Sequence, residues 1–486
     1  MKIGRSSGIL LHLTSLPGRF GIGDLGPTSR WFVDFLADTK QKLWCVLPLG
    51  PTGPDNSPYQ SRSVFAGNPL LVSPELLLER GYVSRKDISP LRNFSPERVQ
   101  FGAVRDYKER LLKNAFLGFS ETREYSKFET GNGWWLEPYA RFMSLREANN
   151  GLPWHRFDKR SKPSRDSVRF HKFVQYEFSR EWEQLHRYCK ERNISILGDM
   201  PFYAEHDSAD VWSNPALFDL RRNGESRTVG GVPPDYFTKD GQRWGTPTYR
   251  WKELQKTGFK WWIDRFRIAF ERADLLRLDH FRGFEAFWCV PANQRTARNG
   301  KWMAGPGAAL FEKVREELGN LPLVAENLGT ITPEVEALRR RFGFPGMGVL
   351  QFAFDDDNVH RPSHYLHAMA CFTGTHDNDT TLGWWKALKK SAKQRSKSAA
   401  RDKIARVKSY FQTDGREIHW SFIQAVLTSV ADLAAVPMQD VLGLGAEARM
   451  NMPGRAAGNW GWRLQEKQIT RALKNRLRDL TVVSGR

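Results

Sequence analysis

Short apolar runs alternate with longer stretches of mixed polarity along most of the chain. Eight of these runs have the length of β-strands: residues 8–13, 43–49, 194–202, 275–281, 321–327, 347–354, 370–375 and 433–438. Strands that alternate with helices typically pair in parallel and are joined by crossover helices. Eight such units predict an α/β fold of the TIM type, a (β/α)₈ barrel.

The clearest helical pattern lies just before the third predicted strand. Apolar residues recur there at intervals of three and four: Phe170, Val174, Phe178, Trp182, Leu185 and Cys189. This spacing puts all six on one face of a helix. We expect that face to pack against the barrel wall.

Two gaps between predicted strands are too long for one helix each. The first predicts an inserted subdomain at about residues 50–193, after the second strand. The second predicts an insertion at about 203–274, and it contains a loop rich in Gly, Pro and aromatic residues at 230–249. About fifty residues follow the eighth strand, too few for an appended β-sandwich. The sequence therefore predicts one barrel over residues 1–486 with inserted subdomains and no C-terminal β-sandwich.

The chain is strongly basic, with 74 Lys and Arg against 54 Asp and Glu and a formal net charge of +20. The densest run, at 386–408, holds ten basic residues and one acid, Asp402. Clustered cations can neutralise nucleic-acid phosphates. The run has helical spacing and no nucleic-acid-binding motif accompanies it, so a solvated helical face is favoured and no nucleic-acid partner is expected. The pattern does not indicate an oligomeric state.

Several features indicate a cytoplasmic protein without a cofactor. No apolar run is long enough to span a bilayer, and the apolar stretch near the start is too short for a secretion signal, so the mature chain is expected to start at Met1 and to make no membrane contact. The cysteines, Cys45, Cys189, Cys289 and Cys371, are far apart and lack the spacing of metal ligands. We expect them to be reduced core residues, and we expect no bound metal and no cofactor.

Three acidic residues lie at or just beyond the ends of predicted strands, where barrel enzymes carry their catalytic groups: Asp279, Glu326 and Asp377. Any one of them could simply cap a helix or pair with an arginine. Three together favour a functional site, because charged groups at the ends of apolar strands are costly unless they are solvated, paired or functional.

Strand alternation places Arg277 and Asp279 on the same side of their strand. The arginine would stabilise the ionised form of Asp279, which suits a nucleophile. Glu326, in a partly dry pocket near anionic groups, should have a raised pKa, which suits a general acid. Two carboxyl groups tuned in opposite directions are the machinery of glycoside cleavage, and in retaining enzymes they lie about 5 Å apart.

Aromatic residues on Gly- and Pro-rich loops are consistent with sugar binding, because flat rings can cover sugar faces. These residues are Tyr59, Tyr236, Phe237 and Trp244. Composition alone would not distinguish a sugar from another ligand.

A set of motifs runs in order from one end of the chain to the other. They are SSGILLH at 6–12, GIGDLG at 21–26, LPLGPTG at 47–53, SPYQ at 57–60, FAGNP at 65–69, DSADVW at 207–212, GVPPDYF at 231–237, RLDHFRG at 277–283, FGFPGM at 342–347, GTHDNDTT at 374–381, PMQD at 437–440 and GNW at 458–460. This set resembles the 4-α-glucanotransferases of glycoside hydrolase family 77, also called amylomaltases or disproportionating enzymes, in the α-amylase clan.

The resemblance implies a barrel enzyme that transfers a segment of an α-1,4-glucan to the 4-hydroxyl of glucose or a maltodextrin, through a covalent glucosyl ester and without a cofactor. It implies that Asp279 is the nucleophile, Glu326 the acid and base, and Asp377 the carboxylate that binds substrate hydroxyls. The implied substrate-binding residues are Ser57, Tyr59, Asp199, Tyr236, Phe237, Gln242, Trp244, Arg277 and His376. Starch, glycogen and maltodextrin are the implied substrate class.

Two alternatives stay open at this point: an α-amylase-like glucan hydrolase with the same carboxylates, and a non-catalytic glucan-binding protein. The chain also departs from the family pattern, with Asn327 where Asp is usual and Thr246 where Asn is usual. Loss of a negative charge beside Glu326 should lower its pKa, so we expect the alkaline limb of the activity profile at a lower pH than with Asp at 327.

Overall fold

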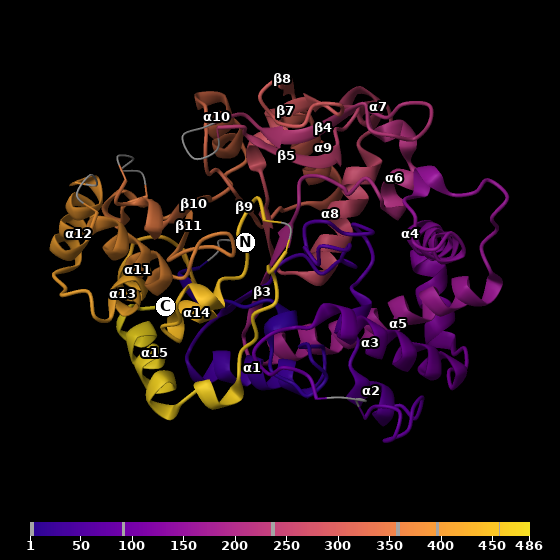
Figure 1. Ribbon diagram of the computed structural model, residues 1–486, viewed down its shortest axis with the longest axis horizontal. Helices are drawn as coiled ribbons and strands as arrows, with labels where there is room; N and C mark the ends of the chain where they lie inside the picture. Colours follow the sequence, from indigo (N-terminus) through magenta and orange to yellow (C-terminus); the bar gives the residue numbers. More distant parts are fainter. Residues whose placement is uncertain (1–3, 90–92, 235–238, 356–359, 395–397, 456) are drawn as a thin grey trace.

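A computed structural model describes residues 4–89, 93–234, 239–355, 360–394, 398–455 and 457–486. Eight parallel strands form its central sheet (Figure 1). In chain order they are β1 (Ser6–Leu10), β2 (Leu43–Cys45), β3 (Ser195–Met200), β6 (Leu275–Leu278), β9 (Leu323–Ala325), β10 (Gly346–Val349), β11 (Met369–Phe372) and β12 (Leu433–Pro437). All eight predicted strands are confirmed. They are shorter than the apolar runs, because the chain leaves the sheet for the loops above it; the run at 347–354, for example, continues after Val349 as a 3₁₀ turn.

The order of neighbouring strands is β10-β11-β12-β1-β2-β3-β6-β9. The first and last strands of this order, β9 and β10, meet at a seam. The N–H of Ala325 donates to the carbonyl of Pro345 at 2.8 Å there. The N–H of Met347 donates to the side-chain oxygen of Asn327, also at 2.8 Å. A backbone bond and a side chain thus close the sheet into a barrel.

Successive residues of β6 face opposite sides of the barrel wall, as predicted. Leu275 belongs to a small apolar cluster inside the barrel, together with residues of the other strands. Leu276 and Leu278 instead belong to the large core between the barrel and the helices. Arg277 therefore points inward on the same side as Leu275. A charged side chain inside the barrel has to find partners there.

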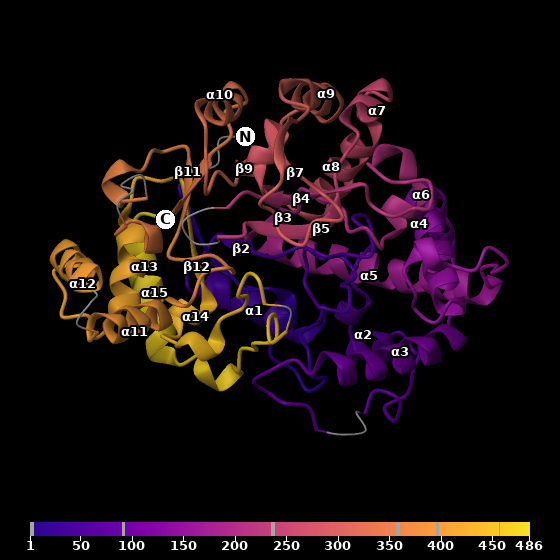
Figure 2. The same cartoon turned by 45° about the horizontal axis from the view of Figure 1, so that its top comes forward.

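The helices surround the barrel. They are α1 (Pro27–Asp38), α2 (Pro74–Glu79), α3 (Phe101–Leu117), α4 (Arg123–Ala148), α5 (Arg165–Glu191), α6 (Ala209–Ser213), α7 (Trp251–Lys256), α8 (Lys260–Arg272), α9 (Ala308–Leu318), α10 (Pro333–Arg341), α11 (Thr381–Ala392), α12 (Ser398–Phe411), α13 (Ile418–Thr428), α14 (Met438–Val441) and α15 (Arg471–Val483). The predicted stripe lies on α5, and all six of its apolar residues are buried. In Figures 1 and 2, α3, α4 and α5 lie on one side of the molecule and α11, α12 and α13 on the other.

The segment at 230–249, predicted as a loop, contains two strands. A four-stranded antiparallel sheet has the order β5-β4-β7-β8, formed by β4 (Thr228–Val232), β5 (Gln242–Pro247), β7 (Ala286–Pro291) and β8 (Lys301–Ala304). The glycines of β4 are the reason that this strand was not predicted. Packing requires glycine at position 230, because a Cβ atom there would lie about 2.4 Å from the ring of Tyr203. The partner strand β7 comes from beyond β6, which local sequence could not indicate.

Other sequence predictions can be compared with the described residues. All four cysteines are unpaired and buried, as predicted. Lys386, Lys389, Lys390 and Lys393 are exposed at and just beyond α11, as expected for a solvated face. Beyond β12 the described residues form helices and turns and no strand, in agreement with the absence of a C-terminal β-sandwich. None of the described helices is both long and apolar enough to cross a bilayer.

Arg486 links the amino ends of two barrel strands to a helix by hydrogen bonds. Its buried guanidinium donates to the carbonyls of Ser6, at the start of β1, and of Asp432, just before β12. It also donates to the carbonyls of Val426 and Leu427 in the last turn of α13, at 3.3 and 2.6 Å. These helix-end carbonyls have no partner within the helix itself. One cation therefore satisfies several buried acceptors.

We expect Arg486→Met to lower the free energy of unfolding by about 3 kcal/mol, because buried carbonyls lose a charged donor. The matched control is Arg478→Met, whose side chain is 44% exposed and pairs with the adjacent Asp479; it should change stability by no more than about 0.5 kcal/mol. Urea unfolding of the three proteins measures both effects. Equal losses in the two variants would contradict this role for Arg486.

Candidate active site

Side chains from neighbouring strands meet at the carboxyl end of the barrel. Asp199 lies near the end of β3, opposite Arg277 of β6 in the strand register. Asp279 directly follows β6, and Glu326 directly follows β9. The parallel register brings all of these ends to the same edge of the sheet, so residues distant in sequence become neighbours.

Arg277 is the cation at the centre of this group. Its Nη1 lies 2.9 and 2.7 Å from the two carboxylate oxygens of Asp199. Its Nη2 lies 3.0 Å from Oδ1 of Asp279. The arginine and Asp199 side chains are 11% and 6% exposed, whereas Asp279 is 28% exposed. The predicted contact between Arg277 and Asp279 is confirmed, and Asp279 is the more accessible of the two carboxylates that Arg277 contacts.

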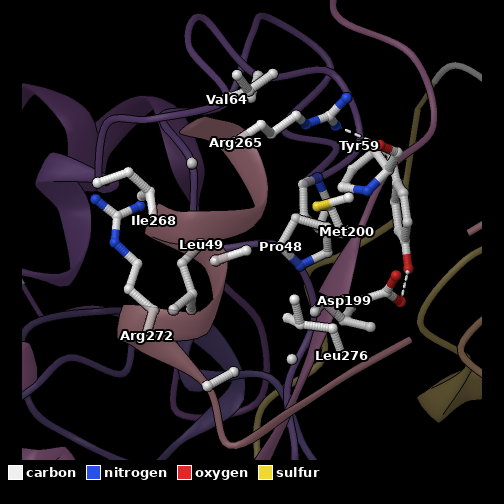
Figure 3. A pocket seen from close by; sticks show the side chains of 18 of the residues that line it. Pro48, Leu49, Tyr59, Val64, Asp199, Met200, Arg265, Ile268, Arg272 and Leu276 are labelled. Atoms are coloured by element: carbon white, nitrogen blue, oxygen red, sulfur yellow. Dashed lines mark hydrogen bonds between the residues drawn. The ribbon is translucent and has the colours of Figure 1, made fainter. Parts of the chain in front are cut away.

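Tyr59 joins the loop after β2 to this cluster. Its hydroxyl donates to Oδ2 of Asp199 at 2.8 Å, as Figure 3 shows. Its ring stacks on that of His376, with centroids 5.0 Å apart and planes 21° from parallel. Trp460 packs beside both rings, with its centroid 6.0 Å from that of Tyr59. Loops from both ends of the chain therefore build one wall of the site.

A cavity of about 80 Å³ lies behind this wall, between the ends of β2 and β3 and helix α8 (Figure 3). Tyr59 and Asp199 line it, together with Pro48, Arg265 and Arg272. Asp279 and Glu326 are not among its lining residues. The cavity therefore lies between the barrel wall and α8, and not between Asp279 and Glu326.

Glu326 is held by backbone donors. The N–H of His280 donates to Oε2 at 2.8 Å, and the N–H of Leu328 donates to Oε1 at 2.9 Å. His280 adopts a left-handed conformation, with φ at 49°, which is uncommon for a residue with a side chain. Because His280 follows Asp279, this bend in the chain couples the positions of the two carboxyl groups.

The pKa of Glu326 is raised to about 7, mainly because burial disfavours its charged form. Arg277 opposes this shift, and the charge of Asp279 adds to it; the two backbone donors also oppose it. The direction predicted from the sequence is confirmed. A pKa near neutrality suits a group that must give a proton and then take one.

Asp377 is held by residues that the sequence analysis did not single out. The side-chain amide of Asn451 donates to its Oδ1 at 2.6 Å, and Arg449 donates to its backbone carbonyl at 2.6 Å. His376 Nε2 lies 3.4 Å from the same Oδ1. Asp377 is itself 47% exposed, so its carboxylate is fixed on one side and open on the other. Asn451 lies 74 residues further along the chain, and only its place near the GNW motif hinted at a role.

The other predicted binding residues lie in two places. Ser57 accepts the N–H of Tyr59 at 3.3 Å, beside the wall. Trp244 of β5 meets the ring of His280 edge-on at a centroid distance of 4.9 Å, and its indole N–H donates to Gln242 at 3.2 Å. The antiparallel sheet thus reaches His280, the residue next to Asp279. Tyr236 and Phe237 lie outside the described residues.

This arrangement is suited to acid, base and nucleophile chemistry. One carboxylate is paired with a cation, a second is buried with its pKa raised to about 7, and a third is fixed by an amide. In the described part of the chain, no group of three His, Cys, Asp or Glu side chains could hold a metal ion. The protein's own side chains are sufficient for displacement at an acetal carbon by two carboxyl groups.

Known proteins match this chain over its whole length. The family model described as 4-alpha-glucanotransferase matches residues 11–470. A 4-alpha-glucanotransferase of Thermus thermophilus is 46% identical, covering all of both chains, and one of Synechocystis is 45% identical, covering 99% of this chain and 98% of its own. The structure of an amylomaltase from Streptococcus agalactiae, in complex with acarbose, is similar with a TM-score of 0.93 and 34% identity over 99% of each chain.

Because Asn451 fixes Asp377, its loss should lower turnover more than stability. We expect Asn451→Ala to lower kcat on maltotriose by about tenfold, since the carboxylate loses a short hydrogen bond and its orientation. Asn451→Asp should lower kcat further, because two carboxylates would then face each other. Steady-state kinetics together with thermal unfolding test this. Equal kcat in Asn451→Ala and the unsubstituted protein would show that Asp377 needs no such support.

Proposed function

This chain belongs to the 4-alpha-glucanotransferase family, and on that premise we propose that Asp279 is the nucleophile and Glu326 the general acid and base of a retaining double displacement. The activity of the protein is that of a 4-α-glucanotransferase. The observation that carries the assignment of roles is the contrast between the two carboxyl groups. Arg277 pairs with the more accessible one, and burial raises the pKa of the other to about 7.

In the first step, a carboxylate oxygen of Asp279 attacks the anomeric carbon of an α-1,4-glucan. The bond from that carbon to the leaving oxygen breaks, and Glu326 gives its proton to the leaving oxygen. The released fragment carries the reducing end. The retained fragment is bound to Asp279 as a β-glucosyl ester, and Glu326 is now ionised.

In the second step, Glu326 removes the proton from the 4-hydroxyl of an acceptor. The acceptor oxygen bonds to the anomeric carbon, the ester bond breaks and Asp279 is regenerated as a carboxylate. Two inversions give net retention. We propose α-1,4-glucans as donors, and glucose or maltodextrins as acceptors.

The remaining polar groups would bind the donor sugar around the reacting carbon. Asp377 with His376 and Asp199 with Tyr59 form one connected group, because the Tyr59 hydroxyl donates to Asp199 and lies 3.4 Å from Nδ1 of His376. Fixed donors and acceptors cost no reorganisation when charge develops on the sugar. Asp377, open on one side, is the group we assign to the sugar hydroxyls.

Transfer exceeds hydrolysis only when a sugar, not water, meets the ester. We propose that the hairpin of β4 and β5 provides this exclusion, because Trp244 lies against His280, next to the nucleophile. Gln242, at the start of β5, would contact the acceptor, and the family resemblance extends this proposal to Tyr236 and Phe237. Ser57, beside Tyr59, would contact the glucan on the opposite wall.

We propose that residues 1–486 act as one catalytic unit, with the segments at about 50–193 and 203–274 as insertions that surround the mouth of the barrel. We also propose the cytoplasm as the location of the protein. Its four unpaired, buried cysteines fit a reducing compartment.

Removal of the nucleophile tests the assignment of roles. The unsubstituted protein should convert maltotriose to glucose and longer oligomers with no net gain of reducing ends, whereas a hydrolase would increase them. We expect Asp279→Asn to lower this conversion by about three orders of magnitude or more, because an amide cannot form the ester. Chromatography measures the conversion of maltotriose to glucose and longer oligomers, and a reducing-end assay measures any net gain of reducing ends. Near-normal turnover in the variant would exclude Asp279 as nucleophile.

The raised pKa of Glu326 predicts a pH dependence. The first step needs the protonated form, so kcat/KM for maltotriose should fall as the pH rises through about 7. Well above this pH, kcat/KM should fall tenfold per pH unit, because it is proportional to the fraction of Glu326 that is protonated. Initial rates between pH 5 and 9 test this. A constant kcat/KM up to pH 9 would mean that Glu326 does not supply the proton.

A further inference from the structure

Asn327, the residue directly after Glu326, spans the seam of the barrel. Its side-chain oxygen accepts the N–H of Met347 in β10 at 2.8 Å. Its side-chain nitrogen donates to Oε1 of Glu336 in α10 at 2.7 Å. One amide therefore connects the end of β9 to the next strand and to the next helix. Both of its functional atoms are used, one as acceptor and one as donor.

The surroundings are shaped for this amide. A side chain at Gly346 would come within about 2.9 Å of the amide nitrogen, so only glycine leaves room for it. Glu336 is held as an anion. Burial would raise its pKa, but hydrogen bonds from Arg339 and Asn327 and the charge of Arg339 lower it overall. Arg339 lies 2.7 Å from Glu336, and its side chain is 10% exposed.

This anchor lies in the middle of the turn that orients the catalytic acid. The carboxylate of Glu326 accepts the N–H of Leu328, two residues further on, at 2.9 Å. The N–H of Glu326 donates to the carbonyl of Leu278 in β6 at 3.0 Å. The turn is thus tied to β6 on one side, and Asn327 ties it to β10 and α10 on the other. Rotation of this residue would move both Glu326 and its donor.

We propose that Asn327 is a positioning residue for the reaction: it acts through Glu326, by locking the turn 326–328 across the barrel seam against Glu336. The proposal rests on the proposed role of Glu326. It also explains why asparagine suits this chain, because the position faces a carboxylate acceptor and a backbone donor at the same time. An aspartate here could satisfy the N–H of Met347 but would repel Glu336.

The test is a charge exchange. Asn327→Asp should lower kcat on maltotriose by about tenfold and move the alkaline limb of kcat/KM to higher pH, because a second anion near Glu326 holds its proton more strongly. In the double variant Asn327→Asp/Glu336→Gln, the new side-chain amide at position 336 can donate a hydrogen bond to the new carboxylate at position 327. Its kcat should return to within about threefold of the original, while the alkaline limb stays shifted.

Two single variants serve as controls. Glu336→Gln keeps an oxygen that accepts from Asn327, so kcat should stay within about threefold. Asn299→Asp introduces the same charge at an exposed site and should change neither kcat nor the pH profile. All assays are run below the lowest unfolding temperature in the set, so that a loss of folded protein is not read as a loss of turnover.

The proposal is wrong if Asn327→Asp keeps the original kcat and pH profile, or if the double variant is no faster than Asn327→Asp alone. The role of Glu326 is checked separately with Glu326→Gln. If that variant retains turnover, the proposed function fails and the seam is only structural. If it is inactive while the Asn327 variants behave as the original protein, only the positioning role fails.

Discussion

The interaction on which the site depends is the pairing of Arg277 with two carboxylates inside the barrel. A guanidinium at this depth would be costly alone, and so would either anion. Together they fix the relative positions of β3 and β6 and leave one carboxylate, Asp279, accessible. Burial raises the pKa of Glu326 to about 7, although the charge of Arg277 opposes this shift. Glu326 can therefore carry a proton near neutral pH, as a general acid must.

The barrel strands form a rigid frame, and the loops that follow them carry polar side chains of the site. Asp377 depends on Asn451, and Asp199 depends on Tyr59, in each case over a long sequence separation. The antiparallel sheet adds Trp244 from a further insertion. Polar contacts between side chains, and not strand pairing alone, therefore set the geometry of the site. This is why conservative changes outside the three carboxylates are expected to affect turnover.

Much of the barrel could be predicted from local sequence, because the spacing of apolar residues shows which side of a strand or helix is buried. The eight strands, the stripe on α5 and the inward direction of Arg277 all follow from it. Contacts that join distant segments left no local signal. The glycines of β4 favour a loop when only the local sequence is considered. The strand that β4 pairs with, β7, lies more than fifty residues away, so local sequence could not reveal the pairing. Asn451 and the two bonds of Asn327 were missed for the same reason, although the identity of Asn327 had been noted.

The most direct measurement is to trap the ester. A 5-fluoro-α-glucosyl fluoride should react with the nucleophile, and its slow second step should allow the ester to accumulate. Peptide mapping by mass spectrometry then locates the added sugar. We predict one 5-fluoroglucosyl unit, attached to the peptide that contains Asp279. A sugar attached to another carboxylate, or release of fluoride with no adduct and inverted product, would contradict it.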